Sequence, residues 1–251
     1  SEETDFDGAA FYKAMRSGAD VKTGLINMTK FNESFEPELQ AGNDVIYIGM
    51  SGGISGTAAI AAVAAAELKE KYPQRRILSF DTYAASLGEG LMVLKAAEML
   101  EKGESFDAVS DMLQALRPNM CQYFTVDDLK YLRKGGRLPA AVAVAGGMLG
   151  IKPLITLKEG KVAMAGKARG LPGAYVALFK KIEELGGINP RFDSLAGYTV
   201  STREVAPIQT YLVDNLGLPE PLVRQIGCVI GTHAGPGAFG LAFFDNGLII
   251  D

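Results

Sequence analysis

The stretch VIYIGMSGGISGTAAIAAVAAAELKEKY, residues 45–72, decides the fold. It begins with an apolar run rich in β-branched residues, passes through a loop of glycines and hydroxyls, and continues into an alanine-rich segment that stops at Pro73. A short, continuous apolar run is typical of a buried parallel strand, and a run of alanines favours a helix. The sequence therefore predicts a strand, a glycine-rich turn and a helix in direct succession.

The same alternation of strand and helix extends to about residue 117. A second apolar run, RRILSFDT at residues 75–82, predicts another buried strand. Helices are predicted over residues 7–16, 84–103 and 104–117. A further helix that carries Phe31 and Phe35 is predicted to begin after a cap at Asn27 or Thr29. Strands that alternate with helices predict a parallel sheet covered by helices.

The second half of the chain has a different pattern. Residues 121–138 predict a strand and a short helix that ends on paired glycines, and residues 150–170 predict a hairpin around a Glu159-Gly160 turn. Further predicted elements are a helix over 173–187, a strand over 196–201, a helix over 204–217, and strands around a Gly/Pro loop in 220–245. The sequence thus predicts an α/β fold of two domains, an N-terminal parallel-sheet layer over residues 1–117 and a C-terminal α+β domain with a mixed or antiparallel sheet over residues 118–251.

Composition excludes several classes of function. The chain has 251 residues, 48% of them apolar and 22% charged, which is ordinary for a soluble globular protein, and we expect it in the cytoplasm. A net charge of −4 argues against a nucleic-acid-binding protein, and no apolar run is long enough for a membrane span. Two cysteines and one histidine without a C-x-x-C pair predict no zinc site, so we expect neither metal nor cofactor.

The glycine-rich loop has the properties of an anion cradle. A helix N-terminus carries unpaired N–H groups and a partial positive charge, and glycines let a ligand come close to them. Ser51, Ser55 and Thr57 add hydroxyls, and no charged residue lies from Val45 to Ala66. The loop therefore predicts a site for an anionic head group, with Ser55 as the helix N-cap, although capping alone would also explain Ser55.

A second interpretation of the same loop is a serine hydrolase. Residues 49–53 form G-x-S-x-G, the pattern of a nucleophile elbow, in which Ser51 would attack and His233 would be the base. Against this, an elbow places its helix directly after the serine, whereas the helix here is expected to begin at Ser55. His233 is the only histidine and is expected in a loop after an apolar strand, where its neutral ring could bind a carboxylate or orient a hydroxyl that does.

Five segments in order resemble the DegV family of bacterial fatty-acid-binding proteins. The segments are SGGISGTAAIAA (51–62), FDTYAASLGEGLMVLKAAEML (80–100), FTVDDLKYLRKGGRL (124–138), GIKPLITLKEGKV (150–162) and VIGTHAGPGAFGLAFF (229–244). The resemblance covers most of residues 7–245. It implies two α/β domains with a long-chain fatty acid between them, and a protein without catalysis of its own that presents the acyl carboxylate to a separate fatty acid kinase. A monomer or weak dimer with transient membrane contact would fit this role.

The resemblance also implies particular site residues. The residues expected to hold the carboxylate are Thr23, Ser51 or Ser55, Gly52 where the family has a second serine, and His233. Arg137 and Arg169 are expected near the mouth or the partner surface. The family begins with a strand that carries an Asp-Ser pair and is missing here, so another segment or chain is expected to cover the apolar edges of the first sheet.

The sequence also contains candidates for the walls of the cavity. The apolar stretches AVAVAGGMLGI (141–151) and GAFGLAFF (237–244) are candidates for walls, although both are equally typical of an ordinary core. A sugar-phosphate-binding module is a third class, on fold-level analogy with kinase subunits for small ketoses.

Overall fold

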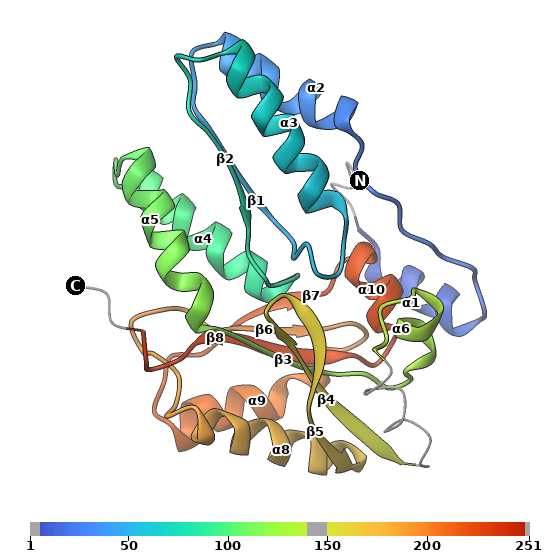
Figure 1. Ribbon diagram of the computed structural model, residues 1–251. Coiled ribbons are helices and arrows are strands. Elements are labelled where there is room, and N and C mark those ends of the chain that lie inside the picture. The colour runs from blue at the N-terminus through green and yellow to red at the C-terminus, as the bar shows by residue number, and fades with distance from the viewer. Residues whose placement is uncertain (1–5, 140–149, 249–251) are drawn as a thin grey trace.

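The computed structural model describes residues 6–139 and 150–248 of the chain. Its strands form two separate sheets, one of two strands and one of six, and helices cover both (Figure 1). The first sheet joins β1 (Val45–Gly49) and β2 (Ile77–Asp81) in parallel. These are the two strands that the sequence predicts, and the predicted α/β layer is confirmed.

Helices pack on both faces of the first sheet because successive strand residues point to opposite faces. Val45 and Tyr47 contact the apolar cluster beneath α2 and α3. Ile46 and Ile48 contact the cluster beneath α4 and α5. The four helices are α2 (Met28–Gln40), α3 (Thr57–Lys71), α4 (Leu87–Glu101) and α5 (Phe106–Leu116). Alanines such as Ala61, which is fully buried, let α3 lie close to the sheet and to α2.

The resemblance implies a further strand in the first sheet, which the described residues do not supply. Residues 45–48 of β1 and 77–79 of β2 are only partly buried. That another segment covers these strands stays a prediction.

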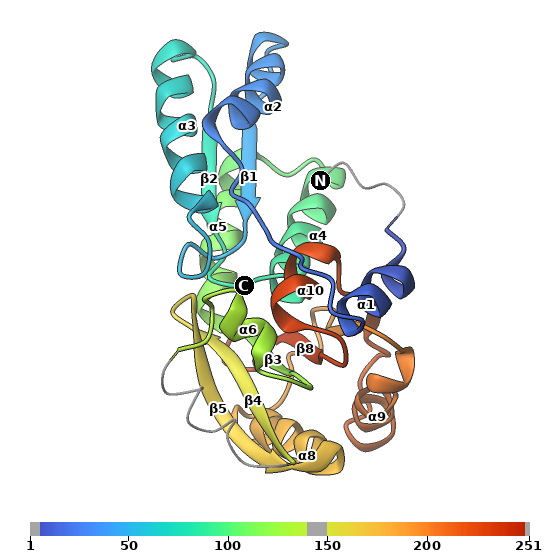
Figure 2. The same cartoon turned by 90° about the vertical axis from the view of Figure 1, so that its right-hand side faces the viewer.

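The second sheet has the strand order β5-β4-β3-β8-β6-β7, and all neighbours are antiparallel except β6 and β7. Its strands are β3 (Met120–Thr125), β4 (Ile151–Lys158), β5 (Lys161–Arg169), β6 (Leu195–Tyr198), β7 (Leu222–Gln225) and β8 (Phe239–Phe244). Helices α8 (Gly170–Glu184) and α9 (Ala206–Thr210) cover the face that points away from the first sheet, as both views show (Figures 1 and 2). The predicted mixed sheet of the second half is therefore confirmed.

Helix α4 belongs to both layers. One side packs on β1 and β2, and Leu87, Leu91 and Met92 reach the inner face of the six-stranded sheet, where they contact Leu195 and Phe244. Backbones come very close here: a Cβ atom on Gly197 of β6 would lie 2.5 Å from a Leu87 methyl group. The two sheets are thus held at a fixed distance by one helix.

The N-terminal segment connects the layers a second time. Helix α1 (Gly8–Arg16) packs beside α10 (Cys228–Ala234), and the Tyr12 hydroxyl donates to the Ile226 carbonyl at 2.5 Å. Residues 17–27, here called the strap, then run without helix or strand to α2 in the other layer (Figure 2). The domain boundary at residue 117 stays a prediction, and α1 lies with the second layer rather than the first.

Turn chemistry predicted several elements well. The β4–β5 hairpin turns at Glu159 and Gly160, which have φ of 49° and 76°, as a tight two-residue hairpin turn requires. Helix α6 (Lys130–Lys134) is followed by Gly135 as its C-cap and by Gly136, which has a φ of 71°. The remaining short elements are η1 (Arg117–Asn119), η2 (Thr202–Glu204) and the π-helical turn η3 (Tyr211–Asn215) that continues α9.

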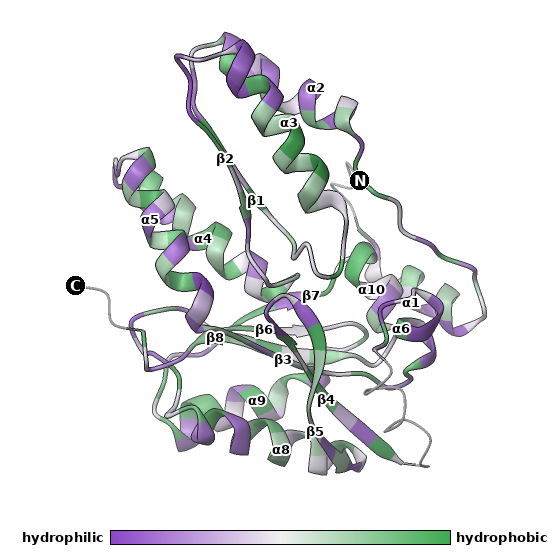
Figure 3. Cartoon of the chain, viewed as in Figure 1, coloured by the Kyte–Doolittle hydropathy of each residue, from purple (hydrophilic) through white to green (hydrophobic). Residues whose placement is uncertain are grey.

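The predicted strand before His233 is wrong. Residues 228–234 form the helix α10, which begins after Gly227 and ends at Gly235, where φ is 79°. The β-branched residues Val229 and Ile230 are typical of a strand, which is why the sequence predicted one here. In the structure their apolar side chains line a cavity instead of a sheet face. Hydrophobic residues gather on α10, whereas hydrophilic residues gather at the tip of the β4–β5 hairpin (Figure 3). None of the described helices is long and apolar enough to cross a membrane.

Two glycines of α4 provide a test of the close packing at this helix. A Cβ atom on Gly88 would lie 2.6 Å from Gln122 Oε1 and 2.9 Å from Ala84 Cβ, whereas one on Gly90 would meet only a Leu195 methyl group at 3.7 Å. Gly88→Ala should lower the free energy of unfolding by about 1–3 kcal/mol through overpacking. Gly90→Ala, the matched control, should leave it unchanged or raise it by up to about 1 kcal/mol through helix propensity. Urea unfolding of both variants measures the difference, and equal effects would contradict the packing described.

Candidate functional site

A cavity of about 470 Å³ lies between the two layers. Its walls come from both layers: the strap, β1 and the loop after it, the start of α4, the middle of β3, α6 and the loop after it, the β4–β5 hairpin, α10 and the start of β8. Most of the lining is apolar, including Ile54, Phe124, Leu157, Ile230 and Phe239. A volume of this size suits a small-molecule ligand, since such pockets measure about 300–1,000 Å³.

One of the two predicted walls contributes to this cavity. In the segment 237–244, Ala238, Phe239 and Gly240 line it, whereas the last four residues are fully buried in the sheet's two clusters. The other candidate, 141–151, falls almost entirely outside the described residues.

At one end of the cavity, here called its head, Thr23 of the strap lies next to His233 of α10. Thr23 Oγ1 and His233 Nε2 lie 2.8 Å apart, and both residues line the cavity. His233 Nδ1 is buried without a hydrogen-bond partner and lies against Gly135, where a Cβ atom would be only 2.0 Å from it. A proton on Nδ1 would have no acceptor, so the ring carries its proton on Nε2 and donates it to Thr23. The Thr23 hydroxyl then keeps its own proton for a ligand.

The charge state of His233 follows from its surroundings. Burial lowers the pKa of the imidazole below its usual value, and the nearby Arg137 guanidinium lowers it further. The ring is therefore neutral at pH 7. Its contribution to the head of the cavity is hydrogen bonding rather than positive charge.

Arg137 supplies the positive charge. It lines the cavity, and no other Lys or Arg among the described residues does. Its Nε donates to the Ile54 carbonyl at 3.1 Å and its Nη1 donates to the Gly135 carbonyl at 2.5 Å. The guanidinium thus joins the loop after α6 to the loop after β1, close to His233. Arg169, by contrast, is exposed at the end of β5 and does not line the cavity.

The loop after β1 places Ser55 and Thr57 in the cavity wall. Helix α3 begins at Thr57 with Gly56 as its N-cap, so the N-cap predicted at Ser55 lies one residue too early. The Ser55 hydroxyl nevertheless accepts from the Thr57 N–H at 3.3 Å. The expected uncharged helix N-terminus at the cavity is present, with two hydroxyls beside it.

Ser51 and Gly52 face away from the cavity. The Ser51 hydroxyl is fully buried, donates to the Gly160 carbonyl at 2.7 Å and accepts from the Gly53 N–H at 3.1 Å. The Gly52 N–H donates to Asp81 Oδ2 at 3.0 Å. Neither residue lines the cavity, so this geometry gives no support to a direct contact of either with a carboxylate. Ser51 instead holds the tip of the β4–β5 hairpin against the loop.

The same contacts argue against the hydrolase. In a catalytic triad the serine is hydrogen-bonded to one histidine nitrogen and a carboxylate accepts from the other. Here the Ser51 hydroxyl is bound to Gly160, His233 Nε2 is bound to Thr23, and Nδ1 has no acceptor. These residues do not form a triad in this structure.

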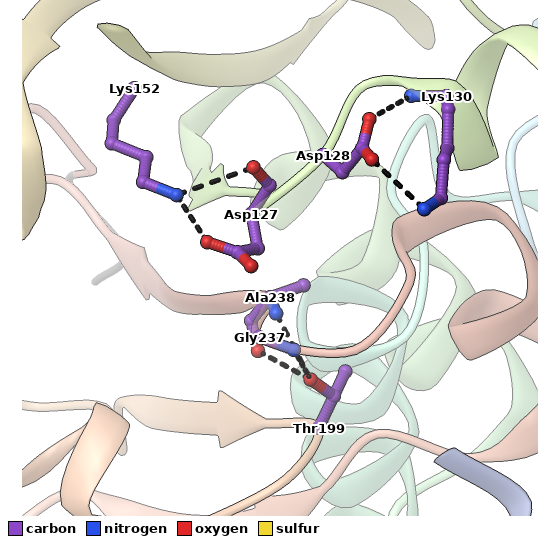
Figure 4. A network of polar contacts seen from close by, with 7 residues as sticks. All are labelled: Asp127, Asp128, Lys130, Lys152, Thr199, Gly237 and Ala238. Atoms are coloured by element: carbon purple, nitrogen blue, oxygen red, sulfur yellow. Dashed lines mark hydrogen bonds and ion pairs between the residues drawn. The ribbon is translucent and has the colours of Figure 1, made fainter. Parts of the chain in front are cut away.

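Two groups that support the site were not predicted from the sequence. Thr199, at the end of β6, fixes the loop after His233: its hydroxyl accepts from the Gly237 N–H at 2.8 Å and the Ala238 N–H at 3.0 Å, and donates to the Ala238 carbonyl at 3.1 Å (Figure 4). The ion pairs Asp127–Lys152 and Asp128–Lys130 lie next to this loop (Figure 4). No short motif announces Thr199, because its partners are 38 and 39 residues away.

The second group is Glu89, which lines the cavity from the first turn of α4. The backbone N–H groups of Ser86 and Met50 favour its charged form, but burial outweighs them. Burial raises the pKa of this carboxyl to about 7. The sequence did contain a signal, since Ser86-Leu87-Gly88-Glu89 has the spacing of a capping box. No group of three His, Cys, Asp or Glu residues in the described part of the chain could hold a metal ion.

The role of Ser51 can be tested by stability. Ser51→Ala would leave the buried Gly160 carbonyl and Gly53 N–H without their partner, so the free energy of unfolding should fall by about 1–3 kcal/mol. Ser34→Ala on the exposed face of α2 is the matched control and should change it by no more than about 0.5 kcal/mol. Urea unfolding of the two variants gives both values. A Ser51→Ala protein as stable as the control would mean that the hydroxyl does not hold the hairpin.

The state of His233 can be read directly, since it is the only histidine. Nitrogen NMR should show the Nε2–H tautomer and an imidazole pKa below 6.5, because burial and Arg137 disfavour the charged ring. The unfolded chain then binds this proton at a higher pH than the folded chain, so stability is lost as pH falls from about 6.5 through the folded pKa. A pKa of 6.5 or above, or a proton on Nδ1, would overturn this description.

Comparisons with known proteins agree with the fold. Residues 1–246 match the family model described as "Uncharacterised protein, DegV family". A DegV domain-containing protein of Clostridium perfringens is 31% identical over 246 residues, which cover 97% of this chain and 84% of that protein. A DegV family protein from Thermus thermophilus, described for its fatty acid binding, matches with a TM-score of 0.84 and 34% identity over 97% of this chain and 86% of that one.

A third match shows the fold alone because only 17% of its residues are identical. It is the Fatty Acid Kinase (Fak) B3 protein of Streptococcus pneumoniae loaded with linoleic acid, with a TM-score of 0.86 over 97% of this chain and 85% of that one. The match to the family model over nearly the whole length, together with these relatives, shows that this chain belongs to the DegV family.

Proposed function

We propose that this protein binds a long-chain fatty acid in the cavity between its layers and presents the carboxylate to a separate fatty acid kinase in the cytoplasm. One observation carries the proposal: a largely apolar cavity of about 470 Å³ has hydroxyls, a neutral imidazole and a guanidinium gathered at one place. The DegV protein of Thermus thermophilus, 34% identical, is described as binding fatty acid. The chain itself would supply no catalytic step.

The carboxylate would lie between Thr23, Ser55 and His233. Because His233 donates to Thr23, the Thr23 hydroxyl can donate its own proton to a carboxylate oxygen. Ser55 and the first N–H groups of α3 can donate as well, and the helix dipole favours an anion there. Arg137 is within this end of the cavity and compensates the charge. The predicted role of Ser55 is thereby favoured over that of Ser51.

Affinity would come mainly from the tail. Each buried methylene contributes about 0.8 kcal/mol, so a long acyl chain can contribute on the order of 10 kcal/mol before ordering costs. A neutral hydrogen bond at the head group contributes about 0.5–1.5 kcal/mol. The polar residues would therefore set the orientation of the ligand, and the apolar walls would set its affinity.

Presentation to a kinase requires the head group near the surface. Leu25, Ile26 and Val229 line the cavity and are also 57%, 45% and 44% exposed, so the cavity reaches the surface beside Thr23. The Streptococcus pneumoniae protein with the same fold is described as a fatty acid kinase protein loaded with linoleic acid. A carboxylate held at Thr23 would be accessible to such a partner while the tail stays inside.

A cavity-filling variant tests the proposal. Ile230→Trp should lower the affinity of delipidated protein for palmitate by more than about tenfold, because the larger ring occupies the space of the tail. Val176→Trp, at an exposed site on α8 outside the cavity, is the matched control and should bind like the wild type. Thr23→Val should cost about three- to tenfold. Native mass spectrometry and calorimetry measure these effects. A wild-type protein that neither co-purifies with nor binds any fatty acid would refute the proposal.

A further inference from the structure

Glu89 is a carboxyl group in the wall of a cavity proposed to hold an acyl chain. It is half-buried, it forms no ion pair with any described residue, and the only groups that favour its charged form are the backbone N–H groups of Ser86 and Met50. The backbone around it is constrained, since Ser86 has a φ of 52°. Glu89 therefore lies in the cavity wall, in the first turn of a helix that begins from an unusual backbone conformation.

The other titratable groups of the cavity wall leave this carboxyl uncompensated. They are Tyr47 on β1, Tyr123 on β3, Arg137 after α6 and His233 on α10, and the strap, the loop after β1 and the hairpin contribute none to the wall. Burial raises the pKa of both tyrosines, to about 12 for Tyr123, so both are neutral. His233 is neutral as well, and Arg137 is bound to two carbonyls beside it. Arg137 acts on the pKa of His233 but is not among the causes that shift the pKa of Glu89.

A fatty acid in this cavity would affect Glu89 in the same direction whichever part of the ligand lies near it. An apolar tail displaces water from the carboxylate, and the loss of hydration disfavours the charged form. An anionic head group adds a second negative charge in a medium of low dielectric constant, which also disfavours the charged form. Both effects make the protonated carboxyl the stable form in the loaded protein.

We propose, on the basis of the fatty acid binding proposed above, that Glu89 takes up one proton from solvent when the ligand binds, so that the cavity accepts a fatty acid anion together with a proton. The carboxylate becomes a neutral carboxylic acid, and the charge of the protein–ligand complex equals that of the empty protein. Glu89 is then the residue of the binding site that makes the affinity for the fatty acid depend on pH. Binding weakens as pH rises, because an ionised Glu89 must first be neutralised.

Calorimetry can count this proton. Palmitate delivered from methyl-β-cyclodextrin is titrated into delipidated full-length protein at pH 8 in phosphate and in Tris, whose different heats of ionisation reveal proton exchange. With a pKa of about 7, Glu89 is about nine-tenths ionised at pH 8 in the empty protein. The wild type should therefore take up about 0.9 proton, and its affinity should be about tenfold weaker at pH 8 than at pH 6. Palmitate itself stays ionised over this range because carboxyls titrate near about 4–5.

Variants assign the proton to its residue. Glu89→Gln keeps an oxygen for the capping contacts, and it should bind palmitate without proton uptake and equally well at both pH values. His233→Gln should bind more weakly but keep the uptake at pH 8, since the imidazole is already neutral there. Equal heats in both buffers for the wild type, or uptake that persists in Glu89→Gln, would overturn the inference while leaving fatty acid binding intact. Failure of the wild type to bind palmitate at either pH would refute the proposed function and this inference with it. If circular dichroism showed Glu89→Gln to be unfolded, equal heats for the wild type in the two buffers, or loss of the uptake in His233→Gln, would still overturn the inference.

Discussion

The packing of α4 between the two sheets is the constraint on which the rest of the structure depends. Leu87, Leu91 and Met92 fill the space above the six-stranded sheet, and the other side of the helix supports β1 and β2. The approach is close enough that Gly88 and Gly197 have no room for a Cβ atom. Because one helix sets the distance between the layers, the space next to its N-terminus cannot collapse, and that space is the cavity. The site is therefore a consequence of how the layers are spaced.

Around the cavity, three separate contacts hold the layers together. Ser51 binds the hairpin tip through Gly160, Arg137 reaches across to Ile54, and Thr23 on the strap meets His233. Each contact joins residues that are at least 83 positions apart in the sequence. Only the last two contribute polar groups to the cavity wall. Within the same glycine-rich loop, one residue, Ser51, holds the layers together, and another, Ser55, lines the cavity.

Local chemistry made much of the fold predictable. The apolar run of β1, the alanines of α3 and the Glu159-Gly160 turn each determine one element, and all three formed as expected. Orientation was harder to predict, because whether Ser51 or Ser55 faces the cavity depends on a hairpin more than 100 residues later. Helix α10 was mistaken for a strand because Val229 and Ile230 are β-branched, and only the tertiary structure shows that their apolar surface faces a cavity. His233 was already a candidate from its place in a Gly/Pro loop, whereas Thr23 and Arg137 were found only through the resemblance to a family. The pairing of Thr23 with His233 became visible only in three dimensions.

The strap has a consequence for the order in which the molecule can form. Helix α1, directly before it, is anchored by Tyr12 to Ile226, and the strap itself is anchored by Thr23 to His233, contacts that span 214 and 210 positions in the sequence. Contacts between such distant residues form late, because the entropy cost of closing a long loop comes before the favourable energy of the contact. During synthesis α1 and the strap must wait for nearly the whole of the following chain before they can dock, whereas β1, α3 and β2 can assemble at once. The head of the cavity is therefore completed in the last step of folding, and only a finished chain has a place for the ligand.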